Sequence, residues 1–375
     1  MVSRIDIWAL RCPIERPVET SFGRMYDRPA VFVRVEAADG CFGWGEIFAN
    51  WPAAGAEHRV NLLARDIAPL ILGQKVDSPD TVFDALTRQT HIRALQCSEW
   101  GPFRQVLAGI DTALWDLKAR SLGLPLRVLL NADASNHVPA YASGIHVNAA
   151  KAELPALRAM GYKAIKVKVG FDTSSDIENL TDLSQSLNDK ERLFADANQA
   201  FDVTRACHFL DASTELGLGW LEEPIPADAP PSDWERVAAR SSTPLAGGEN
   251  IAGEVAFDEV LQHGVLDIVQ PDLAKWGGVT GCVRVAKAAV EAGRIYCPHF
   301  LGGGIGLVAS AEVLAAVGGG GLLEVDVNPN PLRQAFAIGG IDANTGLWDT
   351  GPSEGLGIET LPESLLQYVT HSVSV

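Results

Sequence analysis

Two lysines separated by a single residue, Lys166 and Lys168, are the first residues in this chain whose types and spacing suggest chemistry. They lie in an otherwise apolar run at residues 164–170. Side chains alternate along a strand, so both ammonium groups would share one face. Each would lower the pKa of the other, which would leave one lysine better able to act as a base near neutral pH. Taken alone, the run could also be an exposed edge strand that carries lysines.

Six further apolar runs, each ending near an ionisable residue, follow at nearly even intervals. The ionisable residues are separated by 23 to 28 positions, which is the length of one strand plus one helix. This period is typical of a (β/α)8 barrel, in which the C-terminal ends of the strands converge on one mouth. The residues predicted to meet there are Lys168, Asp196, Glu222, Glu249, Asp272, His299 and Glu324.

Length and composition predict a soluble globular protein of two domains. A barrel takes roughly 200 to 250 residues, so a chain of 375 leaves room for a second domain. The net charge of -17 argues against nucleic acid and against an anionic membrane surface as partners, because both need clustered Lys and Arg. Six cysteines without a C-x-x-C pair, and an N-terminus without the apolar segment of a signal peptide, favour a reducing cytoplasm.

The chain is expected to divide into three parts. Residues 1–130 should form an α+β capping domain, residues 131–327 the catalytic barrel, and residues 328–375 a tail that packs back on the capping domain. Strands followed by helices are predicted in the first part, at 5–10, 31–35 and 41–46 and then at 54–72, 78–94 and 101–122. Loops are expected at 20–28 and 48–52. Helices between the barrel strands are predicted at 150–160, 175–188, 203–216, 232–240, 253–263, 279–292 and 305–317.

Together these features resemble the enolase superfamily, and more closely its mandelate racemase-like branch. That branch has K-x-K on the second barrel strand, carboxylates on the next three, then Asp, His and Glu on the sixth to eighth. The resemblance implies a modified (β/α)8 barrel with an N-terminal α+β capping domain, Mg²⁺ as the cofactor, and a homo-oligomer. The cycloisomerase-like branch instead has a catalytic lysine on the sixth strand, where this sequence has Asp272; Lys275 lies three residues further on.

Three carboxylates on adjacent strands, Asp196, Glu222 and Glu249, would form a hard oxygen site that suits Mg²⁺. Singly, each could equally be a capped or solvated acid. Asn198, two residues beyond Asp196, is placed to hydrogen-bond the hydroxyl or carboxylate of a substrate. The sequence therefore predicts a magnesium centre beside a small-molecule carboxylate.

The remaining site residues would handle protons and charge. Lys166 would add positive charge beside the substrate carboxylate, and Glu324, if protonated, would donate a hydrogen bond to it. Lys168 is the candidate base on one face. On the opposite face His299 would accept or donate a proton, with Asp272 fixing its tautomer.

The predicted function is a Mg²⁺-dependent dehydratase of an acid sugar, an aldonate or aldarate. It would remove the proton α to the carboxylate, form a metal-stabilised enediolate and lose the β-hydroxyl to give a 2-keto-3-deoxy acid. Arg24, Tyr26 and Arg28 in the first cap loop would bind hydroxyls or a distal carboxylate. A racemase or epimerase of a 2-hydroxy acid is the alternative, and a non-catalytic binding protein is a remote one.

Three weaker signals have structural interpretations. The glycines at 302–304 resemble a phosphate-binding loop, but no G-x-x-x-x-G-K-[ST] motif is present, so we interpret them as a tight barrel loop. Glu46 and Glu223 are expected in supporting roles. His146, near the end of the first barrel strand, would either reach the pocket or serve a structural role.

Overall fold

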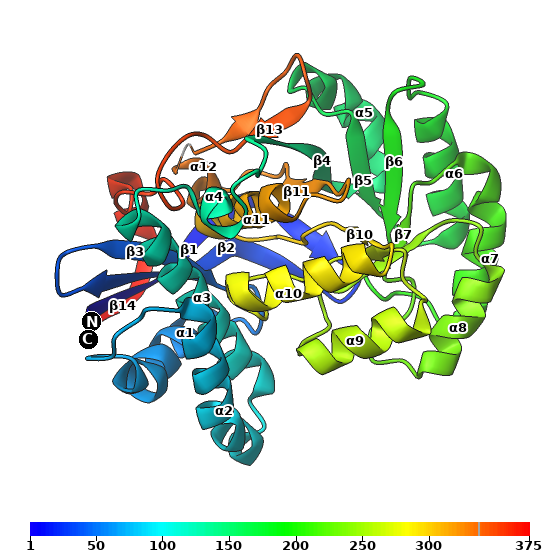
Figure 1. The fold of residues 1–375 in the computed structure, drawn as a ribbon. Helices are drawn as coiled ribbons and strands as arrows, with labels where there is room; N and C mark the ends of the chain where they lie inside the picture. The colour runs from blue at the N-terminus through cyan, green and yellow to red at the C-terminus, as the bar shows by residue number, and fades with distance from the viewer. Residues whose placement is uncertain (337) are drawn as a thin grey trace.

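The computed structural model describes residues 1–336 and 338–375 and contains two packed units (Figure 1). The first is an antiparallel sheet covered by helices, and the second is a ring of parallel strands wrapped by helices. The two ends of the chain lie side by side in the first unit (Figure 1). In the described residues, every helix is too short or too polar to cross a membrane.

A long β-hairpin is the frame of the capping domain. Its strands, and the strand that extends the sheet, are β1 (Val2–Thr20), β2 (Gly23–Ala37) and β3 (Phe42–Ile47). β1 and β2 pair out to Thr20 opposite Gly23, so the loop expected at 20–28 is wrong, and only Ser21 and Phe22 form the turn. Polar residues dominate the outer part of the hairpin, so hydrophobic alternation could not reveal its strands.

The three helices predicted for this domain are confirmed. They are α1 (Gly55–Leu62), α2 (Pro79–Cys97) and α3 (Trp100–Ser121), with a π turn (Leu63–Ile67) and a 3-10 turn (Ala68–Leu70) after α1. α3 buries its apolar stripe against the sheet, in the same cluster as Val33 and Val35. β3 approaches α3 so closely that a Cβ on Gly43 would lie 2.1 Å from the carbonyl oxygen of Ala113. Only glycine fits there.

The described residues include eight parallel strands that form the predicted barrel. They are β4 (His137–His146), β5 (Ala164–Lys168), β6 (Arg192–Asp196), β7 (Leu221–Glu222), β8 (Leu245–Gly247), β9 (Ile268–Val269), β10 (Ile295–Tyr296) and β11 (Leu323–Asp326). The helices between them are confirmed as α5 (Val147–Ala159), α6 (Thr173–Ser184), α7 (Val203–Ser213), α8 (Pro231–Arg240), α9 (Glu254–His263), α10 (Gly278–Glu291) and α11 (Gly304–Val317).

One apolar layer closes the barrel from below. Each strand, or the residue beside it, contributes one buried side chain: Tyr141, Ala164, Phe194, Trp220, Ala246, Ile268, Cys297 and Leu322. Because side chains alternate, the residue two positions later also points into the barrel, one layer higher. That higher layer consists of Ser143, Lys166, Asp196, Glu222, Gly248, Gln270, His299 and Glu324. The alternation of side chains along the strands thus places the predicted site residues directly above this apolar layer.

The tail contacts both units. β13 (Leu347–Asp349) pairs with the start of β4 and with β12 (Gly340–Ile341), so this part of the tail extends the barrel sheet. β14 (Val369–Ser374) then pairs with β1 at the edge of the capping sheet. The first part of the tail therefore lies against the barrel, and its last strand joins the capping domain.

A buried ion pair links the end of the capping domain to the last barrel helix. Arg127, on the short helix α4 (Leu126–Leu130), donates from Nη1 to Glu312 Oε1 at 2.7 Å, and its backbone N–H donates to Glu312 Oε2 at 2.6 Å. Both side chains are almost fully buried. Removing one partner of such a pair leaves an uncompensated charge in a low-dielectric interior.

We expect Arg127→Met to lower the free energy of unfolding by about 3 kcal/mol, because Glu312 would stay buried without its cation. The double variant Arg127→Met, Glu312→Leu should recover most of the loss. Arg240→Met serves as the control, since Arg240 and Asp211 form an exposed pair whose contribution to stability is small. Urea unfolding followed by circular dichroism measures all three. Equal losses for the two single variants would contradict this assignment.

Candidate active site

Lys166 is the centre of the polar layer. Its buried Nζ lies 2.6 Å from Glu222 Oε1, 2.8 Å from Glu324 Oε1 and 3.5 Å from Asp196 Oδ2. Lys168, one step nearer the mouth, donates to the same Asp196 Oδ2 at 2.6 Å. Because both lysines reach Asp196, they share the inner face of β5, as the alternation predicts.

The predicted lowering of the lysine pKa values is wrong for this arrangement. Burial by itself lowers the pKa of Lys168, and Lys166 lowers it further, but the carboxylates of Asp196, Glu222 and Glu249 together outweigh both and the net pKa is raised. Burial also lowers the pKa of Lys166, and Glu222 and Glu324 more than reverse it. The sequence reveals the two like charges, but it does not show how many carboxylates fold around them.

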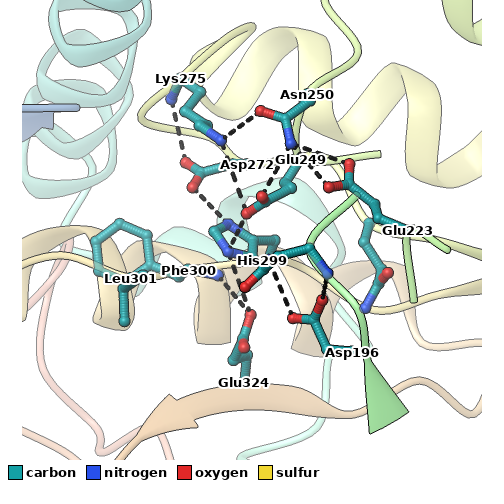
Figure 2. Close-up of polar contacts among 12 residues, drawn as sticks. Asp196, Glu223, Glu249, Asn250, Asp272, Lys275, His299, Phe300, Leu301 and Glu324 are labelled. Atoms are coloured by element: carbon teal, nitrogen blue, oxygen red, sulfur yellow. Dashed lines mark hydrogen bonds and ion pairs between the residues drawn. The ribbon is translucent and has the colours of Figure 1, made fainter. Parts of the chain in front are cut away.

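His299 and Asp272 form a buried pair on another side of the pocket. His299 Nδ1 donates to Asp272 Oδ2 at 2.7 Å, and Asp272 Oδ1 accepts from the backbone N–H groups of Ala274 and Lys275. His299 Nε2 faces the Glu249 carboxylate (Figure 2). Burial lowers the pKa of His299, but Glu249 and Glu324 raise it well above its usual value. One ring nitrogen is therefore held, and the other points into the pocket.

The three predicted metal ligands end successive strands. Asp196 lies opposite Glu222 in the ladder of β6 and β7, and Glu249 follows β8 by two residues. Each carboxylate contacts a cationic side chain: Lys168, Lys166 and His299 respectively. In the described part of the chain, no three Asp, Glu, His or Cys side chains converge closely enough to hold a metal ion as they lie.

The chemistry of the donor set nevertheless fits a hard divalent cation. Two buried amide oxygens, Asn198 Oδ1 and Gln270 Oε1, have no hydrogen-bond partner. Asn198 is anchored by its backbone N–H to Asp196 Oδ1 at 2.8 Å, and Gln270 Nε2 donates to Glu222 Oε2 at 2.8 Å. Carboxylates beside unsatisfied amide oxygens are the ligands that Mg²⁺ prefers.

The groups around Glu324 favour its ionised form over the protonated hydrogen-bond donor that the sequence suggested. Its carboxylate accepts from Ser143 Oγ at 2.6 Å and from the Phe300 N–H at 3.1 Å. Burial raises the pKa of Glu324, but Lys166 and His299 outweigh it and the pKa is lowered. Glu324 therefore connects the Lys166 side of the pocket with the His299 side.

The turn of the long hairpin reaches over the barrel mouth. Ser21 Oγ donates to the backbone oxygen of Asn198 at 2.5 Å. A cavity of about 240 Å³ lies under the hairpin, between residues 17–19 of β1 and the mouth, and its lining includes His146, Asn328 and Lys168. His146 lies opposite Lys168 in the ladder of β4 and β5, so its side chain does reach this cavity.

The three cap residues predicted to bind substrate are placed differently from one another. Arg24 pairs with Glu19 across the hairpin and is 62% exposed, and Tyr26 is 69% exposed. Both side chains point into solvent. Arg28 is buried instead, and its Nη2 contacts Asp326 Oδ2 at the end of β11 while its Nη1 has no hydrogen-bond partner. Arg28 is thus the one of the three that the structure brings to a barrel strand end.

Gln270 is a residue of the site that was not predicted. Gln270 lies two residues before Asp272, so strand alternation could have placed both in the pocket. Glu46 was expected in a supporting role, but its partner could not be foreseen. Its carboxylate accepts from the N–H groups of Gly303 and Gly306 at the start of α11. The glycine-rich loop therefore holds a carboxyl group of the chain itself. Burial raises the pKa of Glu46 to about 7.

Comparison with known proteins supports the same architecture. Residues 4–131 match the family described as "Mandelate racemase / muconate lactonizing enzyme, N-terminal domain", and residues 149–364 match "Enolase C-terminal domain-like". D-galactarolactone cycloisomerase from Agrobacterium fabrum is 28% identical over 95% of both chains. Arabinonate dehydratase from Saccharolobus solfataricus is 28% identical over 94% of this chain and 91% of its own.

Solved structures agree over nearly the full length. A mandelate racemase/muconate lactonizing enzyme from Bordetella bronchiseptica superposes with a TM-score of 0.91 at 42% identity, covering 98% of this chain and 99% of its own. An enolase from Bradyrhizobium, complexed with magnesium and mandelic acid, gives a TM-score of 0.85 at 28% identity, with 99% and 98% covered. With the capping sheet, the barrel and the polar layer at its mouth, this chain belongs to the mandelate racemase/muconate lactonizing enzyme family of the enolase superfamily.

Proposed function

We propose that this protein is a Mg²⁺-dependent dehydratase of an acid sugar, an aldonate or an aldarate. The observation that carries the proposal is the presence of two groups able to move protons, Lys168 on β5 and His299 after β10, on either side of one carboxylate cluster. The relatives named as a sugar-acid dehydratase and a sugar-lactone cycloisomerase support this substrate class. Asp272 follows β9 and holds His299, which favours dehydration or racemisation over a lysine-based cycloisomerisation.

Asp196, Glu222 and Glu249 would hold the magnesium ion, and the magnesium-bound Bradyrhizobium structure supports this choice of cation. When bound, Mg²⁺ supplies positive charge that lowers the cost of a second negative charge on the substrate carboxylate. Lys166 supplies a further positive charge from the barrel interior, where burial strengthens its effect. Asn198 and Gln270 would orient oxygens of the substrate through their amide groups.

Proton transfer divides between the two sides of the pocket. Lys168, in its neutral amine form, removes the proton from the carbon next to the carboxylate, and the electron pair of the broken C–H bond forms the enediolate. The enediolate electrons then expel the β-hydroxyl, and His299 donates its Nε2 proton so that the group leaves as water. Asp272 keeps Nδ1 protonated throughout. The enol that remains tautomerises to a 2-keto-3-deoxy acid.

A racemase or epimerase of a 2-hydroxy acid is the second candidate. The same placement of Lys168 and His299 would let one group remove the α-proton and the other return a proton to the opposite face. The mandelic acid in the Bradyrhizobium structure favours it. The products separate the two reactions, since only dehydration releases a keto acid.

Metal removal should abolish turnover, because the proposed ligands Asp196, Glu222 and Glu249 lie at the ends of three successive strands, where a cation would offset the charge of the substrate carboxylate. Treatment with EDTA should reduce keto-acid release from the best acid sugar by more than about a thousandfold, and added Mg²⁺ should restore it. Glu222→Gln should lose both activity and bound magnesium, measured by atomic emission. Full activity of Glu222→Gln without metal would eliminate the proposed ligand set.

Exchange with D₂O should separate the two proton-transfer groups. His299→Asn should stop keto-acid release while Lys168 still exchanges the α-proton, because the enediolate can return to substrate before the hydroxyl leaves. Lys168→Ala should block both processes. NMR of the recovered substrate and a semicarbazone assay of the product measure them. If Lys168→Ala kept the α-proton exchange and His299→Asn lost it, His299 would be the base. Formation of an epimer without any keto acid would favour the racemase over the dehydratase.

Recognition of the distal end of the substrate should depend on Arg28 rather than on Arg24. Arg28→Ala should lower kcat/KM more than about tenfold, mainly through KM, because a buried donor would be lost. Arg28→Lys keeps the charge facing Asp326 and controls for the ion pair. Arg24→Ala should stay within about threefold. If Arg28→Ala also stayed within that limit, neither Arg24 nor Arg28 would bind the substrate.

A further inference from the structure

A third lysine, Lys275, lies at the pocket on the side of His299. It belongs to the loop after β9, three residues beyond Asp272. Its Nζ is 3.7 Å from Glu249 Oε2 and donates to Asn250 Oδ1 at 3.0 Å. The same Glu249 oxygen faces His299 Nε2. In Figure 2 the contacts of Lys275 and Asn250 run down to Glu249 and from there to His299.

Asn250 joins Lys275 to the carboxylates beneath it. Its Nδ2 donates to Glu249 Oε1 at 2.9 Å and to both oxygens of Glu223 at 3.0 and 2.9 Å. Glu223 is buried, so this amide has a rigid anchor. Glu249 is therefore contacted by an amide on one oxygen and by two cationic groups on the other.

The capping domain covers the same lysine. The Lys275 ammonium lies 5.1 Å from the centre of the Phe48 ring, within the range of a cation–π contact. The Phe48 N–H donates to the Ala274 carbonyl at 3.2 Å, which fixes the cap loop on this barrel loop. Only 17% of the Lys275 side chain is exposed, so its charge is held in place rather than free in solvent.

The charge balance of the pocket gives this lysine a function. Carboxylates outnumber lysines around the mouth, and such a site binds a divalent cation strongly but repels an anionic substrate. A fixed ammonium beside Glu249 offsets one of those charges at the edge of the pocket. It thereby weakens the hold on the metal and attracts the carboxylate of an incoming substrate.

We propose that Lys275 is a positioning residue that acts through Glu249 and Asn250. Its charge lowers the affinity of the pocket for Mg²⁺ and raises its affinity for anionic substrates. The inference rests on the proposed function, since it takes Glu249 as a metal ligand. No contact between Lys275 and the reacting carbon is required. Its effect is electrostatic, so it should follow the charge of the side chain and not its shape.

Three variants test this. Lys275→Gln removes the charge but keeps a donor for Asn250, Lys275→Arg keeps the charge, and Lys287→Gln removes an exposed charge from α10 as the matched control. Isothermal titration of the full chain with Mg²⁺ alone measures metal affinity without turnover. A second titration with glycolate, the smallest 2-hydroxy carboxylate, at saturating Mg²⁺ measures anion affinity.

For Lys275→Gln we expect Mg²⁺ to bind at least about threefold more tightly and glycolate at least about threefold more weakly. Lys275→Arg and Lys287→Gln should match the wild type. If Lys275→Gln weakened the binding of both Mg²⁺ and glycolate, Lys275 would only support the structure around Glu249. If it changed the binding of neither, the charge of Lys275 would be irrelevant. Either result would overturn the inference. A wild type that binds no Mg²⁺ would overturn the proposed function itself.

Discussion

The burial of one ammonium group, that of Lys166, is the interaction on which the mouth of the barrel depends. A lysine inside a closed ring of strands is tolerated only when carboxylates surround it, and Glu222, Glu324 and Asp196 do so here. Those carboxylates in turn require further cations or donors, which Lys168, Ser143 and Gln270 provide. The polar layer is thus one connected network, and each of its members is held by its neighbours.

Much of this architecture could be predicted from periodicity. The interval between strand ends predicted the barrel, and alternation predicted that Lys166 and Lys168 share a face, because both are local properties of a strand. The long-range partners could not be predicted in the same way. The outer hairpin is polar on both strands, the pKa of Lys166 depends on carboxylates from three other strands, and Glu46 finds its donors more than 250 residues away in the chain.

The capping domain contacts the residues around the pocket at three places between residues 21 and 48. Ser21 bonds to the backbone of Asn198, Arg28 pairs with Asp326, and Phe48 lies on Lys275. Two further contacts lie behind the mouth: buried Asp111 of α3 accepts from Thr280 at the start of α10, and Glu46 holds the loop after His299. The barrel supplies the reacting groups, and the capping domain restricts the loops that carry them.

The contact between Glu46 and the glycine-rich loop limits how freely the two domains can be exchanged between relatives. That loop presents backbone N–H groups at the start of a helix, and the capping domain fills it with its own anion. A capping domain exchanged from a relative without an acid at this position would leave the donors open to phosphate from the medium. Glu46 and the loop at 302–306 therefore form a matched pair across the two domains, and a hybrid protein keeps this contact only when its capping domain also carries an acid at this position.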